Sequence, residues 1–395
     1  MKHRSSTITS AVATAALTIV AAFGIAAPAF AVGPNVMNAN VKPGPAGGGV
    51  NGVYGHITVC IPGTSTCQVV GNLLIDTGSF GLRIFRSALS IKLPSLTSGG
   101  ETVAECAFFD SATAWGRVGL ADVTLAAEPA ISNLPVQIIN PAFPAPGDRP
   151  AACDRGGAPL ARTPQQENFN GILGVGLLQY DGGFTDYYAC TASSCGPIAA
   201  PPAAQQVQNP VPLLPVDHNG VMLSMPAISS GGSPPLTGRL VLGINTRLNN
   251  QVPAGYKAFT ANPSTLTFTT DFGGTILPGI IDSGSNGYFF HDAGLALCSG
   301  APPSWYCPAA LTELSAITTG WDGVNSKTKF FFINNAYGLF LTGNSAFSDL
   351  GADLGAGSGF FDWGLPFFFG RQIFVGIAGQ SIVGVSEPTP LWIYK

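Results

Sequence analysis

Residues 75–81 read Ile-Asp-Thr-Gly-Ser-Phe-Gly, and residues 281–287 repeat the pattern as Ile-Asp-Ser-Gly-Ser-Asn-Gly. Each copy places one Asp, Asp76 or Asp282, directly after an apolar strand and before a turn that contains Gly. The copies are far enough apart for each to belong to its own lobe. Two Asp residues on matching turns are what a pair of carboxyl groups that shares one proton requires.

The distribution of Gly and Pro favours an all-β fold. The 395 residues include 51 Gly and 32 Pro, which leave few places for long helices. The apolar segments between these residues are short, and several alternate as half-buried strands do. The expected strands are Val53–Cys60, Gln68–Ile75, Val118–Leu125, Val136–Ile139, Arg239–Leu242, Thr265–Thr269, Lys329–Ile333, Tyr337–Leu341 and Gln372–Ile377. Short helices are expected near Ala309–Ile317 and after Gln205.

The first 31 residues are typical of a secretory leader. A basic start at residues 2–4 precedes a small apolar run, and Ala29-Phe30-Ala31 is a cleavage signal. This pattern predicts a secreted or periplasmic protein. We expect residues 32–52 to be a flexible N-terminal segment, residues 53–250 to form an N-terminal lobe with Asp76, and residues 251–395 to form a C-terminal lobe with Asp282.

Eight cysteines follow the leader, which is typical of proteins from an oxidising compartment. Sequence alone leaves their connectivity open. Short loops are easy to close, so three pairs are favoured by proximity and two cysteines remain for a fourth pair. The proposed disulfides are Cys60–Cys67, Cys190–Cys195, Cys298–Cys307 and Cys106–Cys153.

Charge and composition exclude several classes of partner. The formal net charge is −4, and Lys and Arg are scattered without a basic run, so no nucleic-acid partner is expected. No apolar stretch after the leader is long enough to predict a membrane span. There is no C-x-x-C motif and the four His residues form no pair at ligand spacing, so we expect no metal and no cofactor. The expected partner of a monomeric chain is a peptide or protein substrate.

Two carboxyl groups in contact can supply both the base and the acid that hydrolysis of a peptide bond by water requires. Like charges at that distance cannot both form easily, so the pair Asp76 and Asp282 would hold one proton. The ionised member would accept a proton from water, and the protonated member would donate to the carbonyl oxygen and then to the amine. The alternative is that each motif is an ordinary turn in which Asp bonds its own backbone.

The residues beside each Asp suit a carboxyl pair. The glycines allow the backbone to pass close to the carboxylates and to donate N–H groups to them. The hydroxyls of the residues directly after each Asp can link the two turns. The serines three residues after each Asp can donate to the outer carboxylate oxygens. In the two copies these residues are Thr77, Gly78 and Ser79, and Ser283, Gly284 and Ser285.

These motifs resemble those of the pepsin-like aspartic proteases. In that family each lobe also carries a hydrophobic-hydrophobic-Gly segment behind the active-site turn. Ile172-Leu173-Gly174 matches the first closely, whereas Asp362-Trp363-Gly364 keeps the Gly and departs from the apolar pair. Thr237–Gly243 resembles the strand that closes the first lobe. The resemblance covers most of the mature chain and implies a bilobal fold of two barrel-like lobes, with endopeptidase activity in the cleft between them.

More narrowly, the chain resembles a bacterial secreted family of pepsin-like pattern that is catalogued as of unknown function. Cys60–Cys67, Asp76–Arg83, Trp115-Gly116 and Phe361–Arg371 carry this narrower match. It implies no assigned role.

The resemblance also implies a flap, a β-hairpin over the cleft, at residues 107–118. Asp110-Ser111-Ala112-Thr113 would form its turn and Trp115-Gly116 its return strand. A Tyr in the family's flap hydrogen-bonds a Trp behind the first Asp, and these two positions fall on Phe109 and Arg83. Because Phe has no hydroxyl, we expect either apolar cover by the flap with Arg83 contacting Asp110, or a lower activity.

Two other functions are compatible with the same sequence. The chain could be a catalytically silent binding protein on the pepsin fold, because fold does not imply function. It could also be a secreted structural β-protein in which both Asp motifs are plain turns.

Overall fold

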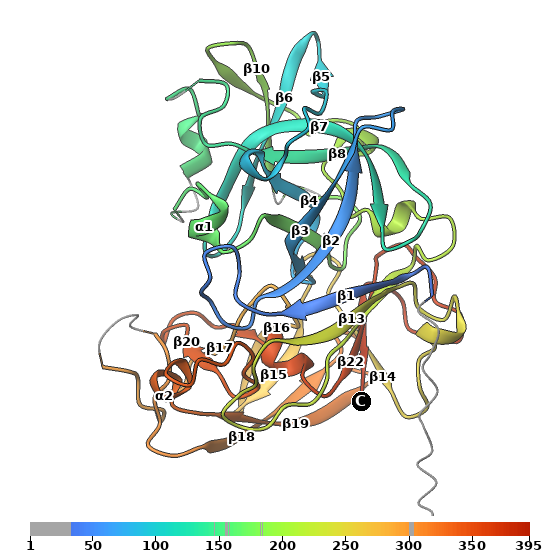
Figure 1. Ribbon diagram of the computed structural model, residues 1–395. Coiled ribbons are helices and arrows are strands. Elements are labelled where there is room, and N and C mark those ends of the chain that lie inside the picture. Colours follow the sequence, from blue (N-terminus) through green and yellow to red (C-terminus); the bar gives the residue numbers. More distant parts are fainter. Residues whose placement is uncertain are drawn as a thin grey trace, which may run out of the picture. The chain divides into compact units, whose positions relative to one another are not determined.

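The computed structural model describes residues 33–299 and 304–395, apart from residues 146, 155, 156, 158, 182 and 184. The expected leader lies outside the described residues. The chain is all-β, with 42% of its residues in strands and 8% in helices, which confirms the predicted class. Figure 1 shows the arrangement of the elements.

The strands are β1 (Val36–Val41), β2 (Val53–Cys60), β3 (Cys67–Asp76), β4 (Phe80–Phe85), β5 (Thr97–Ser98), β6 (Glu101–Phe108), β7 (Thr113–Leu125), β8 (Ile131–Ile139), β9 (Gly171–Val175), β10 (Thr185–Cys190), β11 (Cys195–Ile198), β12 (Gly220–Ser224), β13 (Leu236–Leu242), β14 (Lys257–Thr260), β15 (Phe268–Phe272), β16 (Thr275–Ile280), β17 (Tyr288–Phe290), β18 (Thr312–Thr319), β19 (Ser326–Ile333), β20 (Gly351–Asp353), β21 (Phe361–Asp362), β22 (Gln372–Gly376) and β23 (Leu391–Tyr394). The α-helices are α1 (Pro164–Glu167) and α2 (Ala336–Phe340), and the 3-10 helices are η1 (Arg86–Ala88), η2 (Ala151–Asp154), η3 (Ala203–Gln205), η4 (Val211–Leu213), η5 (Leu248–Asn250) and η6 (Leu365–Phe368).

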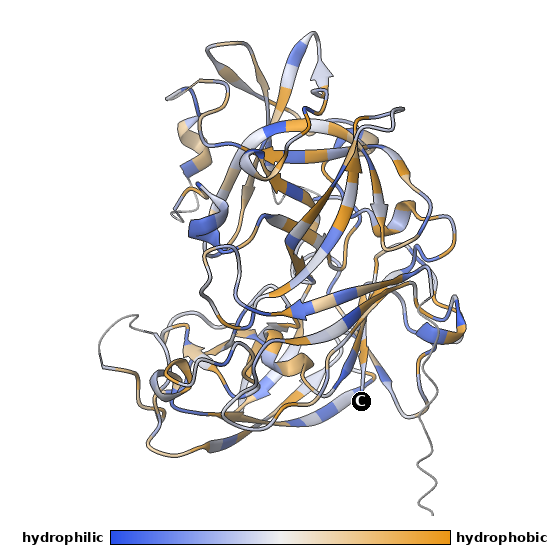
Figure 2. Cartoon of the chain, in the orientation of Figure 1, coloured by the Kyte–Doolittle hydropathy of each residue, from blue (hydrophilic) through white to orange (hydrophobic). Residues whose placement is uncertain are grey.

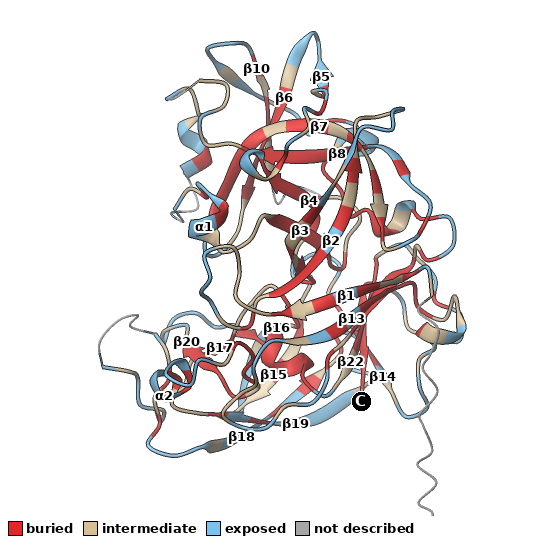
Figure 3. Cartoon of the chain, in the orientation of Figure 1, coloured by how far each residue is buried: buried red, intermediate tan, exposed pale blue. Residues whose placement is uncertain are grey.

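Six strands of the first half of the chain close into a barrel, here called the N-terminal barrel. Their order is β8-β4-β9-β3-β2-β7, and β7 pairs with β8 to complete the ring. Apolar side chains from these strands, including Leu73, Ile75, Leu82, Ile84 and Leu173, are fully buried and form its core. Figures 2 and 3 show apolar and buried residues running through these strands.

Seven strands of the second half form an open half-barrel, here called the C-terminal half-barrel. Their order is β19-β18-β15-β16-β21-β17-β20. Its core is largely aromatic: the rings of Phe290 and Phe361 are stacked with centroids 5.0 Å apart, and Trp363 lies 4.6 Å from Phe361. Aromatic pairs of this kind stabilise a core beyond the area they bury.

The two units repeat one arrangement of strands. The series β8-β4-β9-β3-β2-β7 corresponds to β20-β17-β21-β16-β15-β18, and each of the five pairings has the same direction in both. In each unit a short strand, β9 or β21, lies parallel to the strand before the Asp motif and antiparallel to the strand after it. The repeated sequence motif therefore belongs to a repeated fold.

A sheet in the order β1-β13-β12-β22-β23-β14 connects the halves of the chain across the expected boundary at residue 250, because β12 pairs with β22. The expectation that residues 32–52 are flexible is wrong for residues 36–41, which form β1. This strand alternates buried Met37, Ala39 and Val41 with more exposed residues, and it pairs with both β13 and β2. Burial of one face fixes its position.

Two local predictions in the second half are wrong. Ala309–Ile317 was expected to contain a helix, but Thr312–Thr319 is β18, held between β15 and β19 by tertiary pairing that overrides helix propensity. Tyr337–Leu341 was expected to be a strand, but it lies in and just after α2. Asn335 caps this helix by accepting a hydrogen bond from Gly338 N, and Ala336 and Leu339 are buried one turn apart.

The four expected disulfides are confirmed: Cys60–Cys67, Cys106–Cys153, Cys190–Cys195 and Cys298–Cys307. Four disulfides indicate maturation in an oxidising compartment. Within the described residues, no helix combines the length and the apolar character needed to cross a bilayer.

Candidate active site

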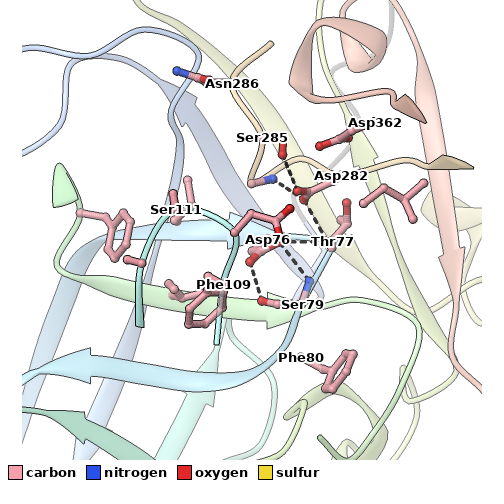
Figure 4. Close-up of a pocket in the computed structure, with 18 of the residues that line it drawn as sticks. Asp76, Thr77, Ser79, Phe80, Phe109, Ser111, Asp282, Ser285, Asn286 and Asp362 are labelled. Atoms are coloured by element: carbon pink, nitrogen blue, oxygen red, sulfur yellow. Dashed lines mark hydrogen bonds between the residues drawn. The ribbon is translucent and has the colours of Figure 1, made fainter. Parts of the chain in front are cut away.

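The repeated folds bring Asp76 and Asp282 to the floor of one cleft of about 800 Å³. Asp76 is the last residue of β3, and Asp282 follows two residues after β16. Asp76 is 6% exposed, whereas Asp282 keeps partial exposure toward the cleft. Figure 4 shows the two side chains beside each other.

Reciprocal hydrogen bonds hold the two turns together. Thr77 Oγ1 accepts from Ser283 N at 2.9 Å and donates to Ile281 O at 3.1 Å. In return, Ser283 Oγ accepts from Thr77 N at 3.1 Å and donates to Ile75 O at 2.7 Å. All four bonds are buried, so each turn has its polar groups satisfied by the other. The link that the two hydroxyls predicted is present.

The glycines and serines donate to the carboxylates as expected from the sequence. Gly78 N donates to Asp76 Oδ1 at 2.9 Å and also to Asp282 Oδ1 at 3.0 Å, and Gly284 N donates to Asp282 Oδ1 at 2.7 Å. The outer oxygens accept from Ser79 Oγ on Asp76 and from Ser285 Oγ on Asp282, the latter at 2.8 Å. Gly78 N is thus a hydrogen-bond donor that the inner oxygens, Oδ1, of both carboxyls share.

Only glycine fits between the two carboxyls. A Cβ at Gly78 would lie 2.5 Å from Asp282 Cγ, and a Cβ at Gly284 would lie 2.7 Å from Asp76 Oδ1. The missing side chains allow each backbone turn to approach the opposite Asp.

The electrostatic environment favours a protonated carboxyl at Asp282. Burial raises the pKa of Asp282 well above its usual range, and the negative charges of Asp76 and Asp362 raise it further. A hydrogen bond from Ser285 opposes these effects. A pair with one raised pKa can retain a proton at a pH where isolated carboxyls would have lost it.

The β6–β7 hairpin lies over this floor, with Phe109, Asp110, Ser111 and Ala112 lining the cleft. Phe109 N donates to Ala112 O at 2.9 Å, and Thr113 already belongs to β7, so the turn begins one residue earlier than predicted. Trp115 on the return strand is fully buried, and its Nε1 donates to Phe143 O. It packs behind the hairpin, away from the cleft.

Arg83 does not contact Asp110, and that expectation is wrong. The buried guanidinium donates to Glu105 Oε1 at 2.7 Å and to Phe80 O at 2.8 Å, and its central carbon lies 5.6 Å from the centre of the Phe109 ring. Burial raises the pKa of Glu105 to about 8, although the charge of Arg83 opposes this shift. The place that an aromatic pair occupies in the pepsin-like pattern is thus occupied by an ion pair under a Phe ring.

The segment after β21 adds a third carboxyl that the sequence marked only as a departure from the family pattern. Asp362 pairs with Ile280, as Ile172 pairs with Leu74 in the N-terminal barrel. It lines the same cleft, is 7% exposed, and accepts from Gly364 N at 2.9 Å. The signal in the sequence was an acidic residue at a position whose counterpart is apolar.

No curated protein matches this sequence. A family model described as "Protein of unknown function (DUF3443)" matches residues 31–394, which is nearly the whole chain, and the protein therefore belongs to that family.

Proposed function

We propose that this protein is a secreted or periplasmic aspartic endopeptidase with a bilobal, pepsin-like fold, in which Asp76 and Asp282 activate a water molecule between them. The observation that carries the proposal is the shared donor: Gly78 N hydrogen-bonds Oδ1 of both carboxyls. The buried, reciprocal Thr77–Ser283 contact supports it, because this contact fixes the two carboxyls as one unit.

The chemistry begins with the pair holding one proton, on Asp282. Ionised Asp76 takes a proton from water as the water oxygen bonds to the carbonyl carbon, and Asp282 gives its proton to the carbonyl oxygen. The resulting diol then collapses: one hydroxyl returns a proton to Asp282, Asp76 protonates the nitrogen, and the carbon–nitrogen bond breaks. The products are a carboxylic acid and an amine, and the pair again holds one proton.

The cleft suits an extended peptide with apolar side chains. Phe80, Phe109, Ile139, Phe289 and Phe360 line it together with the carboxyls. An extended substrate can bond main chain to main chain with a β-hairpin such as β6–β7, and apolar side chains can enter pockets between aromatic rings. We therefore propose apolar residues on both sides of the cleaved bond.

The experiment is cleavage of a diverse peptide library by the mature, disulfide-bonded protein between pH 3 and 7, with and without a statine-type inhibitor. The diol-like hydroxyl of statine resembles the tetrahedral intermediate and should bind between the two carboxyls. The proposal predicts cleavage at acid pH that the inhibitor abolishes. A folded protein that neither cleaves any peptide nor binds the inhibitor would overturn it.

A catalytically silent binding protein is the second candidate, and the Phe109–Arg83 arrangement favours it. The hairpin lacks a hydroxyl at Phe109, and the buried Arg83 is already paired with Glu105. Such a protein would bind extended peptides in the same cleft without cleaving them. Binding of statine-type inhibitors without hydrolysis of any library peptide would favour this function.

A further inference from the structure

The two units differ at a residue beside the carboxyl pair. In the N-terminal barrel the position next to the Asp76 turn is occupied by Ile172, which is apolar and 5% exposed. In the C-terminal half-barrel the corresponding residue is Asp362. A carboxyl group in a nearly buried position is costly unless it is neutral or well partnered, so its presence beside the carboxyl pair calls for a function.

Ser285 lies beside both Asp282 and Asp362. Its hydroxyl donates to Asp282 Oδ2 at 2.8 Å, and Figure 4 shows the Asp362 carboxyl beside Ser285. A serine hydroxyl has a single hydrogen, so a hydroxyl that donates to Asp282 can only accept from Asp362. A hydrogen bond between Asp362 and Ser285 is compatible with this donation only when Asp362 carries a proton and donates it to Ser285 Oγ.

The surroundings keep Asp362 protonated at acid and weakly acid pH. Burial raises the pKa of Asp362 to about 7, the contact with Ser285 and the hydrogen bond from Gly364 N partly oppose this, and the charges of Asp110 and Asp76 raise it further. The flanking strands β16 and β17 and the following helix η6 contribute no charged side chain, and Tyr288 is their one titratable residue. The charges of Asp76 and Asp110 act on Asp362, and the charge of Asp362 acts in turn on Asp282.

We propose that Asp362 is a positioning residue of the active site, which orients the Ser285 hydroxyl toward Asp282 and extends the pair of carboxyls into a three-carboxyl hydrogen-bonded network. The inference rests on the proposed function for its effect on catalysis, but the network itself is a property of the folded protein. Protonated Asp362 holds Ser285 in its donating orientation. Ionised Asp362 places a second negative charge beside Asp282 and makes ionisation of Asp282 harder.

The coupling between Asp362 and Asp282 determines the direction in which the pH profile of activity moves when Asp362 is replaced. Catalysis requires that the pair Asp76 and Asp282 retain one proton, and activity is lost when that proton leaves at higher pH. Once Asp362 is itself ionised, its negative charge delays this loss. Asp362→Asn removes the charge and keeps a neutral donor to Ser285, so the alkaline limb of the activity profile should move to lower pH by about one unit. Asp362→Ile, which copies Ile172, should shift the limb in the same direction and also lower kcat, because Ser285 loses its donor.

The experiment has two independent readouts on the wild type, Asp362→Asn, Asp362→Ile and a control, Asp271→Asn, whose carboxylate accepts from Gly274 N in the turn between β15 and β16. The first is a pH titration by NMR of protein labelled with carbon-13 at the Asp side-chain carboxyls. The second is the pH profile of kcat on a cleaved library peptide. Near-UV circular dichroism establishes that each variant is folded. If Asp362→Asn does not fold, Asp362→Ile tests the proposal in its place.

The proposal predicts that the Asp282 resonance titrates at lower pH in both Asp362 variants and is unchanged in Asp271→Asn. An unchanged Asp282 titration in a folded Asp362 variant would overturn it, whatever the activity. If the titration shifts but the wild type cleaves no peptide, the network stands and the proposed peptidase function fails. If peptides are cleaved and the titration does not shift, the proposed function stands and Asp362 has only a structural role.

Discussion

The N-terminal barrel and the C-terminal half-barrel each hold an Asp at the floor of the cleft, and they do so with different residues. Both place an Asp at the turn between two strands and support it with an inserted segment that contains a Gly. The inserted segment is Ile172-Leu173-Gly174 in the barrel and Asp362-Trp363-Gly364 in the half-barrel. The glycines are equivalent because a Cβ would lie 2.7 Å from Phe80 Cα at Gly174 and 1.9 Å from Gly287 O at Gly364. Both units therefore require glycine at this position, whereas the side chains of the two preceding residues can differ.

The difference between the two units follows from how each is closed. The barrel closes through the pairing of β7 with β8 and fills its interior with aliphatic residues. The half-barrel stays open and packs large rings, with Trp363 at their centre. Its inserted segment, Asp362-Trp363-Gly364, can therefore carry a large aromatic residue on the core side and an acid toward the cleft.

The largest effect should come from the core side of the inserted segments. Trp363 is fully buried among Phe331, Phe361 and Phe367, and its Nε1 donates to Thr270 Oγ1 at 3.1 Å. Trp363→Ala should lower the free energy of unfolding by about 3–5 kcal/mol. Leu173→Ala, its counterpart, should cost less, at about 2–4 kcal/mol, because a smaller cavity is left. Urea unfolding with the disulfides intact measures both, and a smaller loss for Trp363→Ala would refute the view that the aromatic cluster replaces barrel closure.

The glycines between the carboxyls should have the next largest effect, and it should be equal in the two units. Gly78→Ala and Gly284→Ala each introduce a Cβ against the opposite carboxyl, which must move. Because small displacements of reacting groups are costly, each variant should lose about 100-fold in kcat/KM while remaining folded. Gly255→Ala is a control for a glycine with open space around it, although its positive φ costs some stability. Retention of activity in either active-site variant would show that the carboxyls are not held as closely as the structure has them.

Removing either of the two hydroxyls that link the Asp turns should destabilise the protein to a similar extent. Thr77→Val and Ser283→Ala each remove a hydroxyl that makes two buried hydrogen bonds. Each should lower the free energy of unfolding by about 1–3 kcal/mol, since buried partners are left unpaired. Ser326→Ala, at an exposed position, is a suitable control. Thermal unfolding measures the effect, and a large loss on one side with none on the other would break the proposed equivalence of the turns.

The smallest effect should come from restoring a hydroxyl to the hairpin. Phe109→Tyr should change kcat/KM by less than about 3-fold, because Arg83 beneath the ring is already bound to Glu105 and, carrying only donors, cannot accept from the new hydroxyl. Phe109→Ala should raise KM more, since it removes apolar cover from the cleft. Steady-state kinetics on one cleaved peptide separates the two outcomes. A gain of more than tenfold in kcat/KM for Phe109→Tyr would mean that the missing hydroxyl limits the activity of this protein.

The sequence predicted the parts of this site that depend on backbone turns. The two Asp motifs, their glycines and the hydroxyls between them follow from the repeat alone, since such turns need these residues wherever they occur. The boundaries of Val53–Cys60 and the four disulfides were equally accessible, because alternation and short spacing are local signals.

The rest depended on contacts between distant segments. Whether Thr312–Thr319 is a helix or a strand is decided by β15 and β19, and β1 is ordered by β13, which follows it by about 200 residues. The partner of Arg83 could not be read from the hairpin turn, because Glu105 lies on the preceding strand and is completely buried. The sequence showed Asp362 only as a departure from a family pattern, and the strand register was needed to show that it corresponds to Ile172.

The central claim is that Asp76 and Asp282 act as one pair. Its most direct test is the rate of peptide cleavage at acid pH by Asp76→Asn and Asp282→Asn, each compared with wild type and with Asp271→Asn. Since one carboxyl alone cannot act as base and as acid in the same step, each variant should lose at least about 1,000-fold in kcat while binding the statine-type inhibitor more weakly and remaining folded. Retention of near wild-type cleavage by either folded variant would contradict the account.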